Sequence, residues 1–397
     1  MTTNPEIRPE AARAPTSGIV DVMSYARGRP GLIPLFVGEG DLPTPPFIME
    51  AAHRALLAGE TFYTYQRGIP ELRAAIAAYL GRLYRTDVDP ERIYVTVGGM
   101  HAAQIAIRIV AGTGDEVLIP TPSWPNFDGA VTVTGATPVS VPMQAGPDGW
   151  HLDLDRLASL VTPRTRAMVI NSPANPTGWT AGREDLVAML DLARRHGIWI
   201  IADEIYGRFT HDGPEGGLAP SFRDVMAEDD RIMFVQTFSK NWAMTGWRIG
   251  WLEAPVRLGP VIENLVQYST SGVTSFIQRA AVTAIEEGEP FVEGQIARAR
   301  QGRAIVCDGL RATNVVDLPA PPGAFYAFFR VEGRTDTTRL ARDLIDTAQV
   351  GLAPGTAFGG GGEAHLRLCF LRDPVQLAEA VARLGRVLPG LAGAAPA

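Results

Sequence analysis

Short apolar runs rich in Val and Ile alternate along the chain with segments of helical character, and this alternation limits the possible folds more than any other feature. The runs are RIYVTVGG (92–99), DEVLIP (115–120), RAMVINSP (166–173), GIWIIADE (197–204), RIMFVQTF (231–238) and RIGWLE (248–253). Runs of this kind are typical of strands that are buried on both faces of a mostly parallel sheet. Helices are expected at 70–84, where Pro70 suits a first turn, and at 182–197, which Gly197 ends. The pattern predicts an α/β domain with helices flanking an open sheet.

The C-terminal part follows a different pattern. The short strand-like pieces GAFYAFF, QVGLAP and HLRLCF are mixed there with helical segments, which is typical of a smaller α+β domain. The Pro-rich piece LPTPPF (42–47) and the segment EEGEP (286–290) mark the boundaries. We expect residues 1–46 to form an N-terminal arm and part of a small domain, residues 47–287 a large domain, and residues 288–397 the C-terminal small domain.

Composition excludes several classes of function. The 397 residues carry a formal net charge of -7, so nothing attracts the chain as a whole to nucleic-acid phosphates. No window approaches the roughly 18 apolar residues of a membrane helix, and the N-terminal segment MTTNPEIRPEAARAP lacks the apolar core of a signal peptide. Cys307 and Cys369 lack the spacing of a zinc site or a disulfide framework. We expect a cytoplasmic protein with no metal, membrane or nucleic-acid partner.

Polar residues follow four of the apolar runs. Ligands of open α/β sheets bind beyond the carboxyl ends of the strands, so these residues are the first candidates for a site. The segment GGMHAAQ follows the first run and NSPANPTG follows the third. Asp203, Glu204 and Tyr206 follow the fourth run, and Thr237, Ser239 and Lys240 follow the fifth.

Lys240 is the only lysine in a chain with 36 lysine and arginine residues in total. Arginine serves wherever a fixed positive charge is enough, but its guanidinium does not lose its proton. A desolvated lysine can lose its proton and act as a nucleophile, a Schiff-base former or a general base. The alternative is that Lys240 lies on the surface and is the one lysine left by chance in a chain whose composition favours arginine. Its place directly after a buried strand favours the chemical role.

Asp203 ends a run that we expect to be buried on both faces, where an unpaired carboxylate is costly. One partner that justifies it is a protonated ring nitrogen, which the carboxylate would keep cationic. A helix cap or an internal salt bridge would also explain it. A magnesium-binding acid of an NTPase is a further alternative, but that reading needs a GxxxxGK[ST] phosphate loop. Ser239 precedes the single lysine, so the NTPase reading fails.

Four further features suggest a ligand site, and each also has a plainer explanation. GGMHAAQIAIRIV places two glycines where a strand turns into an amphipathic helix, which suits phosphate but also simply makes a tight turn. Trp124 could stack on a flat ring or pack in the core. Arg248 could add charge to the same phosphate or lie on the surface. Arg367, within HLRLCF, would match a bidentate carboxylate or form an internal salt bridge.

These motifs together resemble the pyridoxal-phosphate-dependent aminotransferases of fold type I, class I/II, the aspartate aminotransferase-like family. The resemblance covers nearly the whole chain, through GEGDLPTP, GIPELR, SPANPTG, ADEIY, TFSKNWAMTGWRIGW, PPGAFY, PGTAFG and LRLCF. It implies a large domain with a mixed, mostly parallel sheet flanked by helices, and a smaller α+β domain. It also implies a transaminase that moves an amino group between an L-amino acid and a 2-oxo acid by a ping-pong mechanism, and a homodimer with shared active sites.

The resemblance also implies a role for each matching residue. Lys240 would hold the cofactor as a Schiff base and shuttle the proton between Cα and C4′, with Asp203 on the pyridinium nitrogen and Trp124 stacked on the ring. Tyr206, the third residue counted as catalytic, and Asn175 would bind the phenolic oxygen. The phosphate would be held by Gly99, Met100, Thr237, Ser239 and Arg248, with Tyr63 reaching in from the neighbouring subunit. The substrate would be bound by Arg367, Asn175, Trp124 and the backbone of Gly38.

Two positions depart from the family pattern. The family often has a polar residue where this chain has Met100, and GEGD replaces the more frequent GEPD around Gly38. His101, beside Met100, is grouped with the cofactor-binding residues without a specific role. Two alternatives stay open: a β-eliminating lyase of the same fold, such as a C–S lyase, and a cofactor-binding regulatory domain. The regulatory reading needs a basic DNA-binding module, for which the first 46 residues are too short and too rich in proline. The residues do not identify the amino donor.

Overall fold

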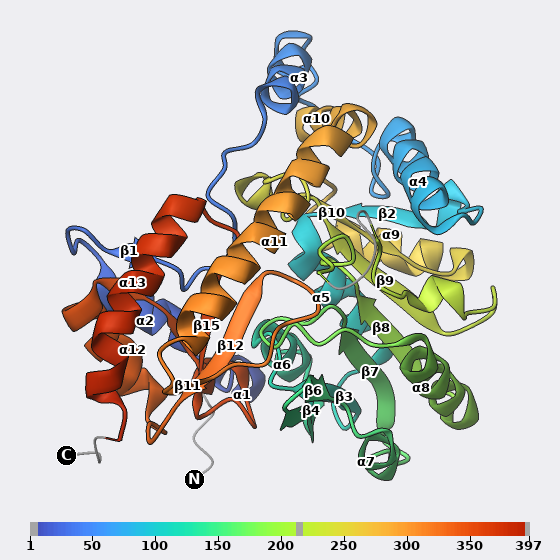
Figure 1. The fold of residues 1–397 in the computed structure, drawn as a ribbon. Helices are drawn as coiled ribbons and strands as arrows, with labels where there is room; N and C mark the ends of the chain where they lie inside the picture. The colour runs from blue at the N-terminus through green and yellow to red at the C-terminus, as the bar shows by residue number, and fades with distance from the viewer. Residues whose placement is uncertain (1–6, 212–216, 394–397) are drawn as a thin grey trace.

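The computed structural model of the chain describes residues 7–211 and 217–393. Its centre is a seven-stranded sheet in the order β2-β10-β9-β8-β7-β3-β4 (Figure 1). The strands are β2 (Ile93–Thr96), β3 (Glu116–Thr121), β4 (Thr137–Pro142), β7 (Thr165–Asn171), β8 (Trp199–Asp203), β9 (Ile232–Thr237) and β10 (Gly250–Glu253). β10 is antiparallel to both of its neighbours, and the other pairs are parallel. The predicted α/β fold with a mixed, mostly parallel sheet is confirmed.

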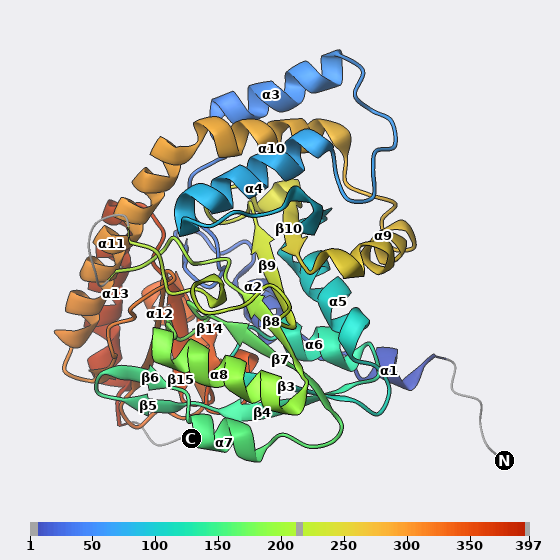
Figure 2. The ribbon, with the colours of Figure 1, turned by 90° about the vertical axis from the view of Figure 1, so that its right-hand side faces the viewer.

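Successive residues of the central strands pack into two separate cores, one on each face of the sheet. Val169 and Ile201 belong to one core, and their neighbours Ile170 and Ile200 belong to the other. The first core is covered by α5 (Gly98–Val110), α6 (Asn126–Thr132) and α9 (Gly259–Gln267). The second core includes residues of α8 (Arg183–His196) and α4 (Pro70–Tyr84) (Figure 2). Burial on both faces explains why these strands read as unbroken apolar runs.

Two long helices connect the central sheet to the rest of the chain. α10 (Ser275–Glu287) packs against α4 and against α3 (Pro46–Leu57). α11 (Glu289–Arg311) follows it after one residue and extends to the C-terminal part of the molecule, as Figures 1 and 2 show. The expected helix at 70–84 is present with those bounds. The helix expected at 182–197 runs from Arg183 to His196, and Gly197 ends it in the left-handed conformation.

The C-terminal part is built on a second, antiparallel sheet in the order β11-β12-β15-β14. Its strands are β11 (Val316–Asp317), β12 (Tyr326–Val331), β14 (Ala353–Pro354) and β15 (His365–Cys369), and its helices are α12 (Thr337–Ala348) and α13 (Pro374–Leu391). The N-terminal residues join it: β1 (Ile33–Pro34) pairs with β13 (Val350–Gly351), and α2 (Gly18–Ala26) contacts α12.

Several elements were not expected from the sequence. They are α1 (Pro9–Ala12), the hairpin of β5 (Gln144–Gly146) and β6 (Gly149–His151), α7 (Leu154–Ser159), and the 3₁₀ turns η1 (Pro90–Arg92), η2 (Phe222–Asp224), η3 (Thr245–Trp247), η4 (Val256–Leu258) and η5 (Gly355–Phe358). β4 was also missed. Its sequence, TPVSVP, contains two prolines and forms the edge of the sheet, where most of its side chains are exposed or only partly buried. Prolines and exposure make an edge strand resemble a loop.

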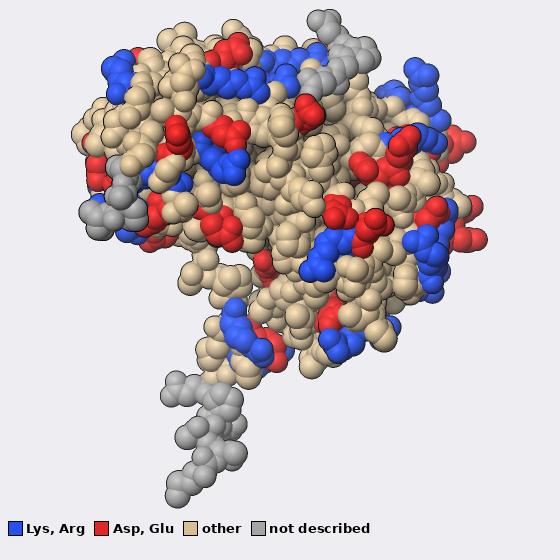
Figure 3. All heavy atoms as spheres, turned by 60° about the horizontal axis from the view of Figure 1, so that its bottom comes forward, with Lys and Arg blue, Asp and Glu red and all other residues tan. Residues whose placement is uncertain are grey.

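The surface view in Figure 3 shows basic side chains lying beside acidic ones, with no continuous field of one sign among the residues coloured on that face. Within the described ranges, no helix is long and apolar enough to cross a membrane. Cys307 and Cys369 are both buried and both free.

Candidate active site

The carboxyl ends of β7, β8 and β9 and the first turn of α5 surround a cavity of about 350 Å³. This is the edge of the sheet at which the polar residues of the sequence predicted a ligand. All of the predicted site residues except His101 and Tyr63 line the cavity. Arg367 on β15 and the loop residue Gly38 line the cavity from the side of the second, antiparallel sheet. The cavity therefore lies between the two sheets.

Lys240 lies three residues beyond the end of β9 and points into the cavity. Its Nζ donates a hydrogen bond to the carbonyl oxygen of Gly38 at 2.7 Å. Desolvation lowers the pKa of this amine from 10.5 to about 8, since burial penalises the charged form. The only lysine of the chain is therefore held where it can lose its proton near neutral pH.

Asp203 ends β8 with 1% of its surface exposed. Its Oδ1 accepts a hydrogen bond from the backbone N–H of Ile205 at 3.3 Å. Burial raises the pKa of the carboxyl from 3.8 to about 7, with a smaller contribution from the charge of Glu204. Among the described residues no arginine, histidine or lysine forms an ion pair with Asp203. A cationic group within the cavity would relieve this unpaired carboxylate.

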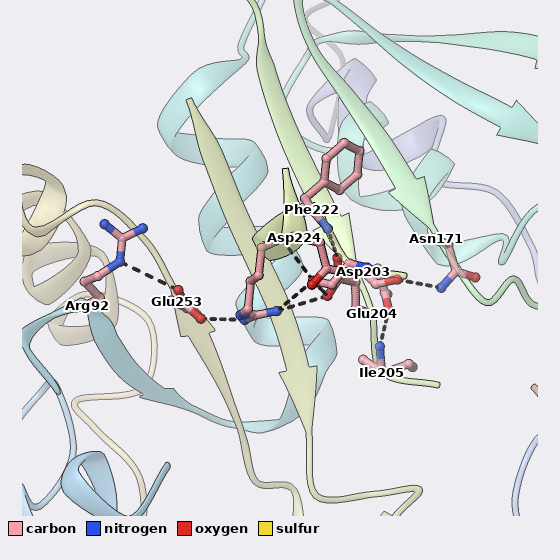
Figure 4. Close-up of polar contacts among 10 residues, drawn as sticks. Arg92, Asn171, Asp203, Glu204, Ile205, Phe222, Asp224 and Glu253 are labelled. Atoms are coloured by element: carbon pink, nitrogen blue, oxygen red, sulfur yellow. Dashed lines mark hydrogen bonds and ion pairs between the residues drawn. The ribbon is translucent and has the colours of Figure 1, made fainter. Parts of the chain in front are cut away.

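Glu204, the next residue, faces the other side of the strand and belongs to a buried network of charges. Its Oε2 lies 3.0 Å from Nη1 of Arg223, whose Nη2 lies 2.5 Å from Oε2 of Glu253. Glu253 is also 3.6 Å from Nε of Arg92 (Figure 4). Successive side chains of a strand point to opposite faces, so one carboxylate of the pair is fixed by arginine while the other is left for the cavity.

A second group of residues forms a cradle for an anion, made by the first turn of α5, the end of β9 and Arg248. Gly98 has a φ of +76°, and a Cβ there would lie 2.7 Å from Nη2 of Arg248. At the end of β9, the N–H of Ser239 donates to Oγ1 of Thr237 at 3.1 Å, which holds both hydroxyls beside the cavity. A helix N-terminus, two hydroxyls and a guanidinium are the groups that bind phosphate in proteins.

Arg367 is a buried cation without a carboxylate partner in the described part of the chain. It is 2% exposed, its Nη1 donates to Oδ1 of Asn175 at 2.9 Å and its Nη2 donates to the carbonyl of Phe36 at 2.5 Å. Its Nε has no partner. Neutral oxygens do not balance a buried guanidinium, so a carboxylate in the cavity would complete its coordination.

Two tyrosines meet beside Arg367. The hydroxyls of Tyr206 and Tyr326 lie 2.8 Å apart, and the Tyr326 hydroxyl also lies 3.3 Å from the carbonyl oxygen of Gly38. Burial raises the pKa of both phenols well above the usual value of 10, so both stay protonated. Trp124 lines the cavity and is held in an edge-to-face contact with Phe127, with the ring centroids 5.3 Å apart.

The two remaining predicted residues lie elsewhere. The Nδ1 of His101 accepts a hydrogen bond from the N–H of Val97, and its Nε2 lies 2.9 Å from Oγ of Ser269. Burial lowers the pKa of His101 to about 4, so it offers no positive charge to a phosphate. The structure gives no support to a cofactor contact from this side chain. Tyr63 is 94% exposed, away from the cavity of its own chain.

Six lining residues were not among the predicted site residues. They are Ile19, Val37, Asn126, Asn171, Ile205 and Tyr326. Asn171 and Tyr326 lie within motifs that the sequence did single out, NSPANPTG and PPGAFY. Nothing in a single sequence shows that Ile19 and Val37, far upstream of the central sheet, fold back onto its edge.

Comparison with known proteins identifies the family. The family model "Aminotransferase class I and II" matches residues 30–384. The chain is 33% identical to an aspartate aminotransferase of Pyrococcus horikoshii, covering 94% of this chain and 95% of the relative. It is 36% identical to aromatic-amino-acid aminotransferase 2 of Thermococcus litoralis, with the same coverage of both chains. The crystal structure of aspartate aminotransferase from Thermotoga maritima superposes with a TM-score of 0.90 at 31% identity, covering 96% of this chain and all of that one.

Proposed function

This chain belongs to the class I and II aminotransferases and is a pyridoxal-phosphate-dependent transaminase, and from that premise we propose how its own residues carry out the reaction. The observation that supports the assignment best is the convergence on one cavity of the only lysine, an unpaired carboxylate and an unpaired guanidinium. The anion cradle at α5 is the fourth part of that set.

The donor set fits pyridoxal phosphate group by group. The space that a Cβ at Gly98 would fill is left open beside Arg248, where a phosphate can approach the backbone. Asp203 needs a cation, and a protonated pyridine nitrogen is one. When bound, the cofactor supplies an aldehyde that bonds to amino groups and a protonated ring that withdraws electrons from the substrate Cα.

We assign cofactor binding to side chains from three strand ends and one helix. Thr237, Ser239 and Arg248 would bind the phosphate together with the backbone of Gly99 and Met100, and Asp203 would hold the proton on the ring nitrogen. Tyr206 and Asn175 would bind the phenolic oxygen, and Trp124 would cover one face of the ring. These roles follow from position in the cavity and from the family.

Lys240 carries the proton transfers. Its lowered pKa lets a neutral amine form near pH 8. A neutral amine can accept a proton from the substrate Cα and deliver that proton to C4′ of the cofactor. Arg367 and Asn175 bind the α-carboxylate and orient the Cα towards Lys240. An L-amino acid and a 2-oxo acid both carry an α-carboxylate, so the donor and the acceptor would bind at Arg367 one after the other. This is the order of binding in a ping-pong mechanism.

The arrangement of domains, the oligomer and the location of the protein belong to the same proposal. We propose that residues 47–287 belong to the large domain, that residues 1–46 provide an N-terminal arm and part of the small domain, and that residues 288–397 provide the rest of the small domain; the pairing of β1 with β13 supports this division. Two copies form a homodimer, and Tyr63 enters the partner's cavity to contact the phosphate; its exposure supports this. A cytoplasmic location is supported by the two free cysteines.

A single-turnover experiment tests the reaction. The holoenzyme is mixed with one L-amino acid and no acceptor, over a panel of donors. A transaminase releases one equivalent of 2-oxo acid per active site and no ammonia, then stops until a 2-oxo acid is added. Continuous release of pyruvate and ammonia would instead indicate a β-eliminating lyase.

The matched control is Lys240→Arg, which keeps a positive charge but cannot supply a neutral amine. We expect this variant to bind cofactor weakly and to release no 2-oxo acid above background. Borohydride reduction of the wild-type holoenzyme followed by peptide mass analysis should place the cofactor on residue 240. Turnover by the arginine variant would overturn the assignment.

A further inference from the structure

The hydroxyl of Tyr326 occupies a position in the cavity to which the proposed reaction assigns no function. Tyr326 begins β12, is completely buried, and comes from the motif PPGAFY. Its hydroxyl lies 2.8 Å from the hydroxyl of Tyr206 and 3.3 Å from the carbonyl oxygen of Gly38. The guanidinium of Arg367 lies 4.8 Å from the centre of its ring, so the ring is fixed from a second side.

One proton has to serve these two neighbours. A tyrosine hydroxyl donates a single hydrogen bond and can accept others. The oxygen of Tyr206 lies 2.8 Å from the Tyr326 hydroxyl and the carbonyl oxygen of Gly38 lies 3.3 Å from it, so Tyr206 is the nearer of the two acceptors open to Tyr326. The shorter distance therefore directs the Tyr326 proton to Tyr206.

The direction of this bond decides where the Tyr206 proton points. If Tyr206 donated to Tyr326, its only proton would be used in that bond and would not be available to the cofactor. If Tyr206 accepts from Tyr326, its own proton is free to be donated into the cavity, where a neighbouring hydrogen bond also strengthens it as a donor. Both phenols stay protonated because burial raises the pKa of each, so neither hydroxyl becomes a phenolate acceptor.

We propose that Tyr326 is a positioning residue whose hydroxyl donates to Tyr206 and thereby directs the Tyr206 proton to the phenolic oxygen of the cofactor. The proposal rests on the role given to Tyr206 in the proposed function. It makes Tyr326 part of the tuning of the cofactor without direct contact with the substrate, and it assigns a function to the tyrosine of PPGAFY.

The pH titration of the holoenzyme's visible absorbance tests this proposal without measuring activity. The group that titrates is the nitrogen by which Lys240 would hold the cofactor. A hydrogen bond donated to the cofactor's phenolic oxygen stabilises the negative charge on that oxygen most when this nitrogen has lost its proton. Weakening the hydrogen bond therefore raises the pKa of this nitrogen. We expect Tyr326→Phe to raise it by about half a unit to one unit, the equivalent of one ordinary hydrogen bond. Tyr206→Phe should raise it further in the same direction.

The double variant separates positioning from a merely structural effect. Because Tyr326 acts through the Tyr206 hydroxyl, Tyr326→Phe should add no shift in a Tyr206→Phe background. The matched control is Tyr94→Phe, which removes another fully buried hydroxyl, one that has no hydrogen-bond partner and does not line the cavity. Its titration should coincide with that of the wild type.

Two results would overturn the proposal: a Tyr326→Phe titration identical to the wild type, or the same shift with and without the Tyr206 hydroxyl. No shift in Tyr206→Phe would instead refute the role of Tyr206 in the proposed function. If Tyr326→Phe does not fold, Gly38→Ala provides a second route, since its Cβ would lie 2.6 Å from the Tyr326 hydroxyl and would push that hydroxyl, together with its ring, away from Tyr206. That variant should shift the titration upwards, and an unchanged titration would count against Tyr326.

Discussion

At the scale of single residues, Asp203 and Glu204 show how one strand end gives two carboxylates different chemistry. Glu204 is balanced by Arg223, whereas Asp203 is buried without a cation. The sequence predicted the buried position of Asp203 from the apolar run before it. It could not predict the arginine that neutralises Glu204, because Arg223 lies in a segment without regular periodicity.

The unpaired carboxylate makes the stability of the apoenzyme depend on pH. The pKa of Asp203 is raised in the folded state to about 7, above the 3.8 of the unfolded chain, so between these values the folded protein binds the extra proton. This contribution to the free energy of unfolding is fully present below pH 3.8 and is lost as the pH rises to about 7. The loss is at most about 4 kcal/mol.

Urea unfolding of wild type and Asp203→Asn apoenzyme between pH 4.5 and 7.5 measures this loss. The difference in free energy of unfolding between the two proteins should change across the range, because asparagine does not titrate. A saturating concentration of cofactor should remove the change, since a ring-nitrogen cation keeps Asp203 ionised in the folded state. A pH-independent difference in the apoenzyme would contradict the raised pKa.

Tyr326 and His101 mark the limit of prediction from residue identity. Both lie in or beside recognised motifs, but no function was predicted for Tyr326, and His101 was grouped with the cofactor-binding residues. The His101 ring turns towards Ser269 because a helix places neighbouring residues about 100° apart, and only Met100 of the two lines the cavity. Which of two adjacent side chains faces a site depends on helix phase, and an error of one residue in that phase exchanges them.

At the scale of elements, the strand ends and the turn before α5 assemble the site. The alternating runs predicted the positions of β2, β3, β7, β8, β9 and β10, because burial on both faces leaves a continuous apolar signal. They could not predict that β10 is antiparallel, since a buried strand has the same composition in either direction. Strand direction is set by the connection before it, here the segment that carries Lys240 and Arg248.

Gly98 is where the geometry of the turn limits the choice of residue. Gly98→Ala places a Cβ 2.7 Å from Nη2 of Arg248 and puts alanine at a φ of +76°, which costs roughly 1–2 kcal/mol. We expect the dissociation constant of pyridoxal phosphate from the apoenzyme to rise about tenfold or more, a loss of about 1.4 kcal/mol or more. The control is Gly112→Ala, just beyond the other end of α5, where a Cβ meets no atom within 4 Å. Equal affinities in the two variants would exclude the cradle at Gly98.

The buried charge network of Glu204, Arg223 and Glu253 adjoins the end of β8, where Asp203 lines the cavity. Arg223→Met would leave two carboxylates buried without their shared cation, which costs about 3–5 kcal/mol in the free energy of unfolding. Replacing both carboxylates by glutamine in the same protein should recover much of that loss, because the amides carry no charge. Arg195→Met, an exposed position on α8, is the control and should change stability by less than about 0.5 kcal/mol. A triple variant as unstable as the single one would show that packing, not charge, is responsible.

At the scale of the whole molecule, the cavity depends on segments far apart in the sequence. Gly38 and Arg367 reach it from the C-terminal sheet region, and Lys240 and Asp203 reach it from the central sheet. The sequence predicted an α/β domain from the alternating apolar runs and a smaller α+β domain from the short strand-like pieces near the C-terminus. The way in which the N-terminal residues return to β13 and α12 could not be predicted, since two-residue strands such as β1 leave no periodic signal.

Sharing of active sites between two copies can be tested by complementation. Tyr63 is almost fully exposed on its own chain, so its proposed function requires a second copy, whereas Lys240 acts within its own chain. Lys240→Ala removes the reactive amine from the cavity of its own chain. Tyr63→Ala removes the proposed phosphate contact from the cavity of the other copy. In a mixed dimer, one of the two cavities has Lys240 from one chain and Tyr63 from the other, and is complete.

Equal amounts of the two variants, unfolded together and refolded, should form mixed dimers as about half of the population by the symmetry of a twofold assembly. With one complete cavity in each mixed dimer, activity at limiting cofactor should return to about one quarter of wild type, well above either variant alone. The control is the same mixture combined without unfolding, in which subunits do not exchange and activity stays at the sum of the two variants. If the refolded mixture shows only that sum, Tyr63 does not cross to the neighbouring cavity and the shared-site dimer is wrong.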